Sequence, residues 1–301
     1  MKNVTYCFIV NPVSGKNKGK KVMVLVEEVL KKKNVDYQLY VTNKPGEAQF
    51  LASQASREKY DVIVAIGGDG TIHEVLNGMI HSKKKLGIIP AGTGNDLAKS
   101  LNYPTNVEQA LETVLNGHTR KIDIGRINGN YFINFASIGL DALIAEEANK
   151  MKKLYSSRYT YVLAVLKGII VFKSPTIKVL IDGKEQKREI MLLAICNGAY
   201  YGGGMKIAPT ADVADGYLDV CLIRKMSKLK LLFLFPTIFT GNHVKYKEVE
   251  FYRGKKVEVS SQSKFKFNAD GEVKDHLPTT VEIIEKGIEI IWNKENTFLE
   301  S

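Results

Sequence analysis

Cysteine, tryptophan and long apolar runs are scarce in this sequence of 301 residues. The three cysteines, Cys7, Cys196 and Cys221, are too few for a disulfide framework, and they lack the spacing of metal ligands. We interpret them as small buried apolar side chains. This pattern excludes the small disulfide-rich secreted proteins and fits a reducing compartment.

No segment reaches the length of a membrane span. The longest apolar stretch, residues 231–239, contains Pro236 and is much shorter than the ~20 residues that cross a bilayer. The first apolar run, residues 6–10, meets Asn11-Pro12 and is too short for the core of a signal peptide. We therefore expect a cytoplasmic protein that is neither exported nor integral to a membrane.

Acidic residues are in deficit, with 32 Asp and Glu against 43 Lys and Arg, so the net charge is +11. Such an excess attracts nucleic acid, an anionic lipid surface or a polyphosphate substrate. The lysines form scattered clusters without the interleaved aromatic residues of nucleic-acid-binding motifs, so we expect no nucleic-acid partner. Solvated helix faces account for most of these lysines, and charge alone does not choose between the other two partners.

Strands alternate with helices over the first 125 residues. The apolar runs at 4–10, 61–66 and 86–89 are short and continuous, as in strands buried on both faces, and helical periodicity follows each of them. This pattern predicts an open parallel sheet covered by helices. We therefore expect an α/β domain over residues 1–125.

Strand-like runs dominate after residue 125. Asp182-Gly183 and Lys286-Gly287 indicate tight turns between strands, while helices are expected at about 155–172 and 228–240. The second domain, residues 126–294, is therefore expected to be a mainly antiparallel β-sandwich. Whether the tail, residues 295–301, packs back on the first domain is left open.

Three of the predicted parallel strands end in glycine-containing loops that precede helices. These loops read NPVSGK at 11–16, GGDGT at 67–71 and PAGTGND at 90–96. Ligands of an open parallel sheet bind beyond the carboxyl ends of its strands, where glycines let backbone amides approach a phosphate. The first loop is not a P-loop motif, because Gly15 and Gly19 are one residue too close. Together the three loops still predict a phosphate-binding site.

Asp69 lies among the glycines of the second loop, where it would repel a polyphosphate. A bridging Mg²⁺ would remove the repulsion, and a turn or helix cap before Thr71 is the structural alternative. Asp96 presents the same choice. A further acidic cluster, Asp212, Asp215 and Asp219, surrounds Gly216 and suits either a Mg²⁺ or Ca²⁺ site or a polar turn.

Glu272 follows a tight-turn pair, Asp270-Gly271, at the end of a strand-like run. A carboxylate at such a loop edge is either a proton acceptor in catalysis or a solvent-exposed turn residue. Asp270 is the rival for the catalytic role, and the residues themselves do not decide between the two.

The second and third loops together resemble the catalytic region of diacylglycerol kinases, which sphingosine and ceramide kinases share. The resemblance continues through NFASIGLD at 134–141, YGGGM at 201–205, residues 209–219 and NADGE at 268–272, so it covers nearly the whole chain. The length and two-domain outline are similar to those of the soluble bacterial diacylglycerol kinase-like lipid kinases. The Asp69 loop alone also fits NAD kinases and phosphofructokinases, and the first domain is expected to share their open α/β fold.

This resemblance implies an ATP site, a catalytic pair and a structural metal site. Glu272 would be the general base and Asp69 its catalytic partner, while Asp212, Asp215 and Tyr217 would hold Mg²⁺, partly through backbone oxygens. The residues implied at the ATP site are Asn11, Pro12, Val13, Ser14, Gly15, Thr42, Gly67, Gly68, Asp69, Gly70, Thr71, Ile72, His73 and Thr93.

The resulting expectation is an ATP- and Mg²⁺-dependent lipid kinase that visits anionic membranes peripherally. Diacylglycerol, converted to phosphatidic acid, is the leading acceptor; phosphatidylglycerol, a sphingoid base and, more distantly, NAD are alternatives. A catalytically silent nucleotide- or lipid-binding regulator is an alternative from another class. Residues 228–233 join a basic flank to an apolar face and are the expected membrane contact. A homodimer is left open.

Overall fold

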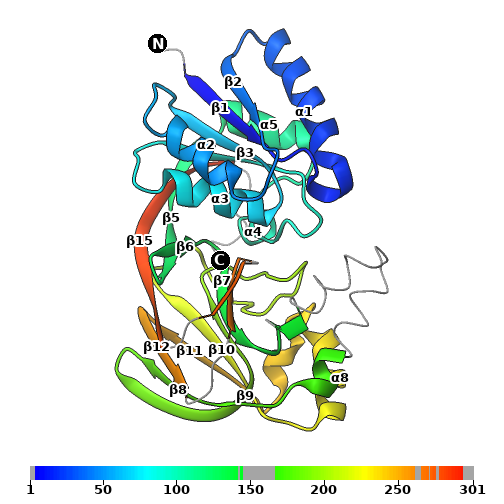
Figure 1. Ribbon diagram of the computed structural model, residues 1–301, viewed down its shortest axis with the longest axis vertical. Coiled ribbons are helices and arrows are strands. Elements are labelled where there is room, and N and C mark those ends of the chain that lie inside the picture. Colours follow the sequence, from blue (N-terminus) through cyan, green and yellow to red (C-terminus); the bar gives the residue numbers. More distant parts are fainter. Residues whose placement is uncertain are drawn as a thin grey trace. The chain divides into compact units, whose positions relative to one another are not determined.

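The computed structural model describes residues 4–141, 143–144, 167–261, 266–270, 272–275 and 278–293. The chain divides into two compact units (Figure 1). Unit 1 contains the chain up to Ile124, the short segment Val213–Asp215 and the chain from Ile284; unit 2 contains Gly125–Asp212 and Gly216–Ile283. The tail 295–301 and most of the helix expected at 155–172 lie outside the described residues, although 167–171 are helical.

Unit 1 is an open parallel sheet with helices between its strands, as the sequence predicts. Its strand order is β15-β4-β3-β1-β2. The strands are β1 (Thr5–Val10), β2 (Asp36–Val41), β3 (Val62–Gly67), β4 (Lys85–Pro90) and the end of β15 (Thr279–Trp292). The helices are α1 (Ser14–Lys32), α2 (Glu47–Ala55), α3 (Asp69–Met79), α4 (Asp96–Ser100) and α5 (Val107–Asn116).

The chain order within this sheet creates a switch point between β1 and β3. From β1 the chain moves to β2 on one side, and β3 and β4 then lie on the other side. The loops that follow β1 and β3 therefore diverge, which opens a crevice at the carboxyl ends of the strands. All six residues of β3 are buried because helices cover both faces of the sheet, which explains its continuous apolar sequence.

Unit 2 is built from antiparallel strands in two sheets, which confirms the predicted sandwich. The strands in or entering it are β5 (His118–Ile127), β6 (Asn130–Phe132), β7 (Phe135–Gly139), β8 (Thr176–Ile181), β9 (Lys184–Cys196), β10 (Leu218–Arg224), β11 (Val249–Gly254), β12 (Lys256–Ser261), β13 (Lys266–Ala269), β14 (Glu272–Asp275) and the start of β15. The long strand β9 joins the sheets, because its first half pairs with β8 and its second half with β7 and β10.

Alternate side chains of β10 enter two different apolar clusters. Leu218, Val220 and Leu222 face the core between the sheets, whereas Cys221 and Ile223 face a cluster on the opposite side of the strand. The period of two follows from the pleat of a strand. The second cluster is covered by α8 (Lys228–Ile238), which is followed by the short helix η1 (Asn242–Lys245).

Of the two tight turns that the sequence predicts, one is confirmed and the other prediction is wrong. Asp182-Gly183 does turn the chain between β8 and β9, with φ of 46° and 81°. Lys286-Gly287, in contrast, lies inside the continuous strand β15. There Lys286 adopts a φ of 53°, and its backbone N–H donates to the Asp123 carboxylate at 2.6 Å. This hydrogen bond satisfies the irregular position, and the strand continues through it without reversing the chain.

The cysteines are buried, as the sequence predicts. All three are unpaired with one another. Within the described ranges, every helix is too short or too polar to cross a membrane.

Candidate active site

A cavity of about 400 Å³ lies in unit 1 at the carboxyl ends of all four strands β1 to β4. Nine of its lining residues are in the predicted ATP site: Asn11, Val13, Ser14, Gly15, Thr42, Gly68, Gly70, Thr71 and Thr93. Six others complete the wall: Asn43, Lys44, Pro45, Ala48, Glu74 and Gly92. The structure therefore brings together the loops that the sequence singled out, and it adds the rest of the loop after β2, of which only Thr42 was predicted.

The loop after β1 makes a left-handed turn. Gly15, Lys16 and Asn17 have φ of 58°, 60° and 69°, although only glycine adopts this region without cost. A Cβ on Gly15 would lie 2.3 Å from the carbonyl oxygen of Ala91, so this loop rests directly on the loop after β4. Strain held at two non-glycine residues is typical of ligand-binding loops. The sequence predicts the helix only from residue 20. The left-handed turn before it was not predicted, because Lys16 and Asn17 are not residues that indicate such a turn.

The loops after β3 and β4 approach each other through two glycines. A Cβ added to Gly92 would lie 2.5 Å from the Cα of Gly68, so position 92 does not tolerate a larger residue. The side-chain oxygen of Asn95 accepts a 2.9 Å hydrogen bond from the Gly92 N–H and fixes the loop after β4. The approach leaves bare backbone at the cavity wall, which suits a phosphate group better than an apolar ligand.

Asn11 connects the first loop to the start of α3. Its side-chain amide donates to the Thr71 hydroxyl at 3.1 Å, and its side-chain oxygen accepts from the Val13 N–H at 3.2 Å. Thr71 is buried against Gly67, where a Cβ would approach within 2.5 Å. These contacts hold the N-terminus of α3, with its partial positive charge, beside the cavity.

The wall after β2 is held by Glu74 of α3. The two carboxylate oxygens of Glu74 accept from the backbone N–H groups of Gly46 at 3.0 Å and Ala48 at 3.1 Å. They thereby cap α2 and fix the adjacent loop, in which Lys44 places a cation at the cavity. Sequence reasoning missed Glu74 because its partners are more than twenty-five positions away. Beyond Thr42, the loop after β2 could also have been predicted, since it begins at the same sheet edge as the glycine loops.

Five predicted residues flank the cavity without lining it. Gly67, Ile72 and His73 are buried in β3 and α3, and Pro12 lies in the first loop. Asp69 is the first residue of α3, and its carboxylate accepts a 2.9 Å hydrogen bond from the Leu97 N–H. Asp69 thus caps the first turn of α4. The sequence suggested instead that Asp69 caps its own helix or forms a turn before Thr71.

Glu272 opens β14 and stands opposite Ala269 of β13. Its rival, Asp270, is buried and accepts from the N–H groups of Ile133 at 2.9 Å, Asn134 at 3.2 Å and Phe135 at 3.0 Å. Asn197 supports the same segment by donating to the Ile133 carbonyl at 2.7 Å. Asp270 is therefore committed to the backbone of unit 2.

Asp212 and Asp215 are both exposed, on either side of the buried Val213. The Val213 carbonyl accepts from the Asp123 N–H at 2.7 Å, which ties this turn to β5. The ring of Tyr217 lies under the guanidinium of Arg253, 4.8 Å from its centroid. In the described part of the chain, His, Cys, Asp and Glu side chains nowhere form a group of three suited to a metal ion. Metal binding at this turn would therefore need backbone oxygens as well.

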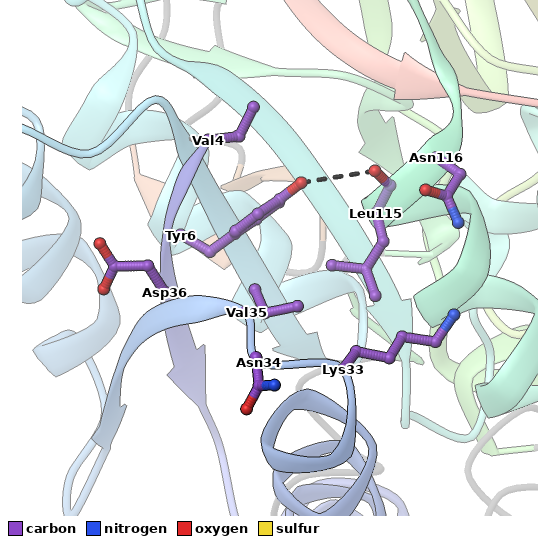
Figure 2. Close-up of a pocket in the computed structure, with 8 residues that line it drawn as sticks. All are labelled: Val4, Tyr6, Lys33, Asn34, Val35, Asp36, Leu115 and Asn116. Carbon is purple, nitrogen blue, oxygen red and sulfur yellow. Dashed lines mark hydrogen bonds between the residues drawn. The ribbon is translucent and has the colours of Figure 1, made fainter. Parts of the chain in front are cut away.

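A second cavity, of about 320 Å³, lies at the opposite edge of the same sheet. Figure 2 shows the Tyr6 hydroxyl directed at the Leu115 carbonyl, to which it donates at 3.4 Å. Burial raises the pKa of Tyr6, and the nearby Asp61 raises it further. The C-terminal ends of α1 and α5 border this cavity and carry partial negative charge. It is therefore a poor site for a phosphate.

An open parallel sheet with a glycine-walled cavity at its switch point, followed in the chain by an antiparallel sandwich, defines a class of two-domain proteins with an α/β and a β domain. Residues 5–127 match the family model described as the diacylglycerol kinase catalytic domain. Residues 134–292 match the one described as the YegS C-terminal NAD kinase beta sandwich-like domain.

Named relatives agree with these matches. The diacylglycerol kinase of Staphylococcus carnosus is 30% identical over 289 residues, which cover 95% of this chain and 94% of that protein. The diacylglycerol kinase of Staphylococcus epidermidis is 31% identical, over 95% of this chain and 92% of the relative. The crystal structure of a diacylglycerol kinase from Bacillus anthracis str. Sterne shares the fold, with a TM-score of 0.75, 20% identity and coverage of 97% and 98%. The chain belongs to the diacylglycerol kinase family of lipid kinases, and it is a phosphotransferase enzyme.

Proposed function

We propose that the protein transfers the γ-phosphoryl group of ATP to the hydroxyl of a membrane lipid, with diacylglycerol as the acceptor and phosphatidic acid as the product. The observation that carries this proposal is the cavity at the ends of β1 to β4. Its walls combine bare glycine backbone, a helix N-terminus and the cation of Lys44, the features that bind a nucleoside polyphosphate.

The donor set near the cavity fits Mg²⁺. Asp69 supplies a carboxylate at the start of α3, and carboxylate oxygens are the ligands that Mg²⁺ prefers. When bound, Mg²⁺ would neutralise charge that develops on the phosphates. Asp69 itself would orient the metal–nucleotide complex, while its hydrogen bond with the Leu97 N–H keeps the carboxylate in place.

The acceptor hydroxyl needs a proton acceptor as its bond to phosphorus forms. Glu272 is our candidate for this general base. Support comes from the environment of Asp270, whose carboxylate is buried and engaged by three backbone N–H groups, and from the family to which the chain belongs. Asp212, Asp215 and Tyr217 remain candidates for a structural Mg²⁺ site.

Diacylglycerol is preferred because it is the acceptor named for the relatives from two Staphylococcus species. A diacylglycerol resides in a bilayer, so the enzyme must visit a membrane surface, and its net charge of +11 favours an anionic one. Phosphatidylglycerol and sphingoid bases are the competing acceptors.

The test is transfer of labelled γ-phosphate from ATP to a panel of lipids in mixed micelles. The panel contains diacylglycerol, phosphatidylglycerol and sphingosine, with NAD as the soluble control and chelator as the metal control. We expect labelled phosphatidic acid and loss of turnover with chelator. A labelled product from another lipid only would replace the acceptor, and labelled NAD phosphate would overturn the lipid assignment.

A further inference from the structure

The helix α8 presents apolar side chains on two opposite faces. Leu231, Leu234 and Ile238 are buried against the sheet of unit 2. On the other side, Leu229 is 66% exposed and Phe233 is 68% exposed. These two residues are four positions apart, so they stand on one face of the helix together with the exposed Leu232 and Pro236. A helix with apolar side chains on both faces is usually covered by apolar groups on both faces. The exposed face of α8 therefore lacks an apolar partner among the described residues.

A second exposed apolar segment lies next to α8. The ammonium group of Lys228 donates to the carbonyl of Ile170, which brings the helical residues 167–171 beside the start of α8. Ile170 is 64% exposed, and Val171 is exposed too. Their neighbour Ile169 belongs to the same buried cluster as Leu231. We call the exposed residues Ile170, Val171, Leu229, Leu232 and Phe233 the α8 ridge. Exposed apolar side chains gathered on neighbouring segments are typical of an interaction site.

The segment that contains α8 is basic. Between Asp219 and Glu248 the sequence has no acidic residue, yet it has the basic residues Arg224, Lys225, Lys228, Lys230, Lys245 and Lys247. Three of them pair with acids outside this stretch: Arg224 with Glu250, Lys225 with Glu189 and Lys230 with Glu248. Lys173, beside Val171, is also exposed. An apolar ridge in a basic field complements a bilayer with anionic head groups, whose surface attracts cations and whose interior accepts apolar side chains.

We propose that the α8 ridge is the surface by which this enzyme inserts into an anionic membrane. Leu229, Phe233 and Ile170 enter the boundary between head groups and acyl chains, and the neighbouring lysines lie among the head groups. This inference rests on the proposed function, because a lipid acceptor gives the enzyme a reason to dock. It narrows the expectation for residues 228–233 to one helix face and adds residues 170 and 171, which the sequence did not indicate.

The test measures partition of the whole protein onto vesicles, so it requires no turnover. The probes are vesicles of phosphatidylcholine alone and of phosphatidylcholine mixed with phosphatidylglycerol. The test variant is Leu229→Ser with Phe233→Ser, and the matched control is Val24→Ser with Phe50→Ser, two exposed apolar residues of α1 and α2. Melting curves check that each variant folds.

We expect the wild type to favour the anionic vesicles and to lose binding as salt rises. The α8 variant should partition at least about tenfold more weakly, since two apolar side chains no longer leave water, and the control should bind as the wild type does. Lys228→Gln should weaken binding roughly fivefold.

Unchanged partition of a folded α8 variant would overturn the inference, as would equal losses in the test and control variants. A dimeric wild type and a monomeric α8 variant would overturn it too, because the ridge would then be an interface between two copies of the chain. The two proposals fail separately. A protein that binds vesicles through α8 but phosphorylates no lipid would contradict the proposed function alone. Normal lipid kinase activity in micelles with unchanged vesicle binding by the α8 variant would contradict this inference alone.

Discussion

Asp270 and Phe135 are joined by hydrogen bonds in both directions. The Asp270 carboxylate accepts from the Phe135 N–H at 3.0 Å, and the Phe135 carbonyl accepts from the Asp270 N–H at 3.1 Å. With two more N–H donors, from Ile133 and Asn134, the carboxylate is surrounded by main chain. Asp270 therefore anchors the turn that leads to Glu272, and it holds a φ of 44° while doing so.

Asp270→Asn should destabilise unit 2. The side-chain amide of asparagine carries no charge, and its NH₂ group would face one of the three backbone N–H groups that now donate to Asp270. Hydrogen bonds to a charged group contribute about 1.5–3 kcal/mol. We expect the free energy of unfolding to fall by about 2 kcal/mol, measured by denaturant titration. Asp182→Asn is the matched control, because Asp182 also has a positive φ and accepts from two N–H groups, but it is exposed. Equal losses of unfolding free energy in both variants would contradict the inference that burial strengthens the hydrogen bonds of Asp270.

Glu272→Gln should lower kcat by at least about 100-fold, because it keeps the size of the side chain and removes its basicity. The KM for ATP should change little if Glu272 acts only on the acceptor. Steady-state kinetics with saturating lipid and ATP give both constants. The comparison is folded Asp270→Asn, assayed below its melting temperature, which should retain more of its kcat. The reverse ranking would make Asp270 the base.

Asp69→Asn should reduce kcat about 100-fold while the melting temperature stays near that of the wild type. The physical reason is that asparagine keeps the oxygen that accepts from the Leu97 N–H, so the link between α3 and α4 survives. Only the charge that would meet Mg²⁺ is lost. A steeper dependence of turnover on added Mg²⁺ is the accompanying readout. Near-normal turnover in this variant would reduce Asp69 to a helix cap.

Local sequence patterns predicted the parts of the site that depend on local conformation. Continuous apolar runs located β1, β3 and β4, because burial on both faces leaves no alternation in such strands. Glycine located the loops after β3 and β4, because the approach of Gly92 to Gly68 excludes any side chain. Since strands of a parallel sheet end at one edge, the convergence of the loops followed from the fold class alone.

Contacts between distant residues were not predictable in the same way. Glu74 looks like an ordinary helix residue, and only the fold brings it to the N-terminus of α2. Lys286-Gly287 reads as a tight turn, yet the carboxylate of Asp123 satisfies the Lys286 N–H and allows β15 to continue. Asp270 and Glu272 are indistinguishable by local pattern, and the partners of Asp270 lie more than 130 positions away.

Chelation should reveal whether the turn at Asp212 and Asp215 binds a metal. An ion that binds only the folded protein stabilises it by about 2.7 kcal/mol at one hundred times its Kd. We expect Mg²⁺ to raise the melting temperature of the wild type above its value in chelator, and Asp215→Ala to abolish most of the difference. Asp36→Ala, a change at another exposed aspartate, is the control. Identical wild-type melting curves with Mg²⁺ and with chelator would leave this segment a polar turn.

Acid should destabilise the protein through His243. This histidine is fully buried beside Phe251, and its Nε2 lies 3.0 Å from the Ile207 carbonyl, so Nε2 carries the proton in the neutral ring. Burial lowers the pKa of His243 below its ordinary value of 6.5, although the hydrogen bond with Ile207 opposes the shift.

As the pH falls below about 6.5, the unfolded chain therefore binds a proton that the folded chain refuses, and stability is lost down to the lowered folded pKa. We expect a loss of up to about 1.4 kcal/mol per pH unit in that window, measured by denaturant titration between pH 7.5 and about pH 5. His243→Gln keeps a donor for the Ile207 carbonyl and removes the titration, so its stability should depend less on pH than that of the wild type. His118→Gln, at an exposed histidine, serves as the control and should follow the wild type. If the slopes of wild type and His243→Gln coincide, the acid sensitivity arises from other groups.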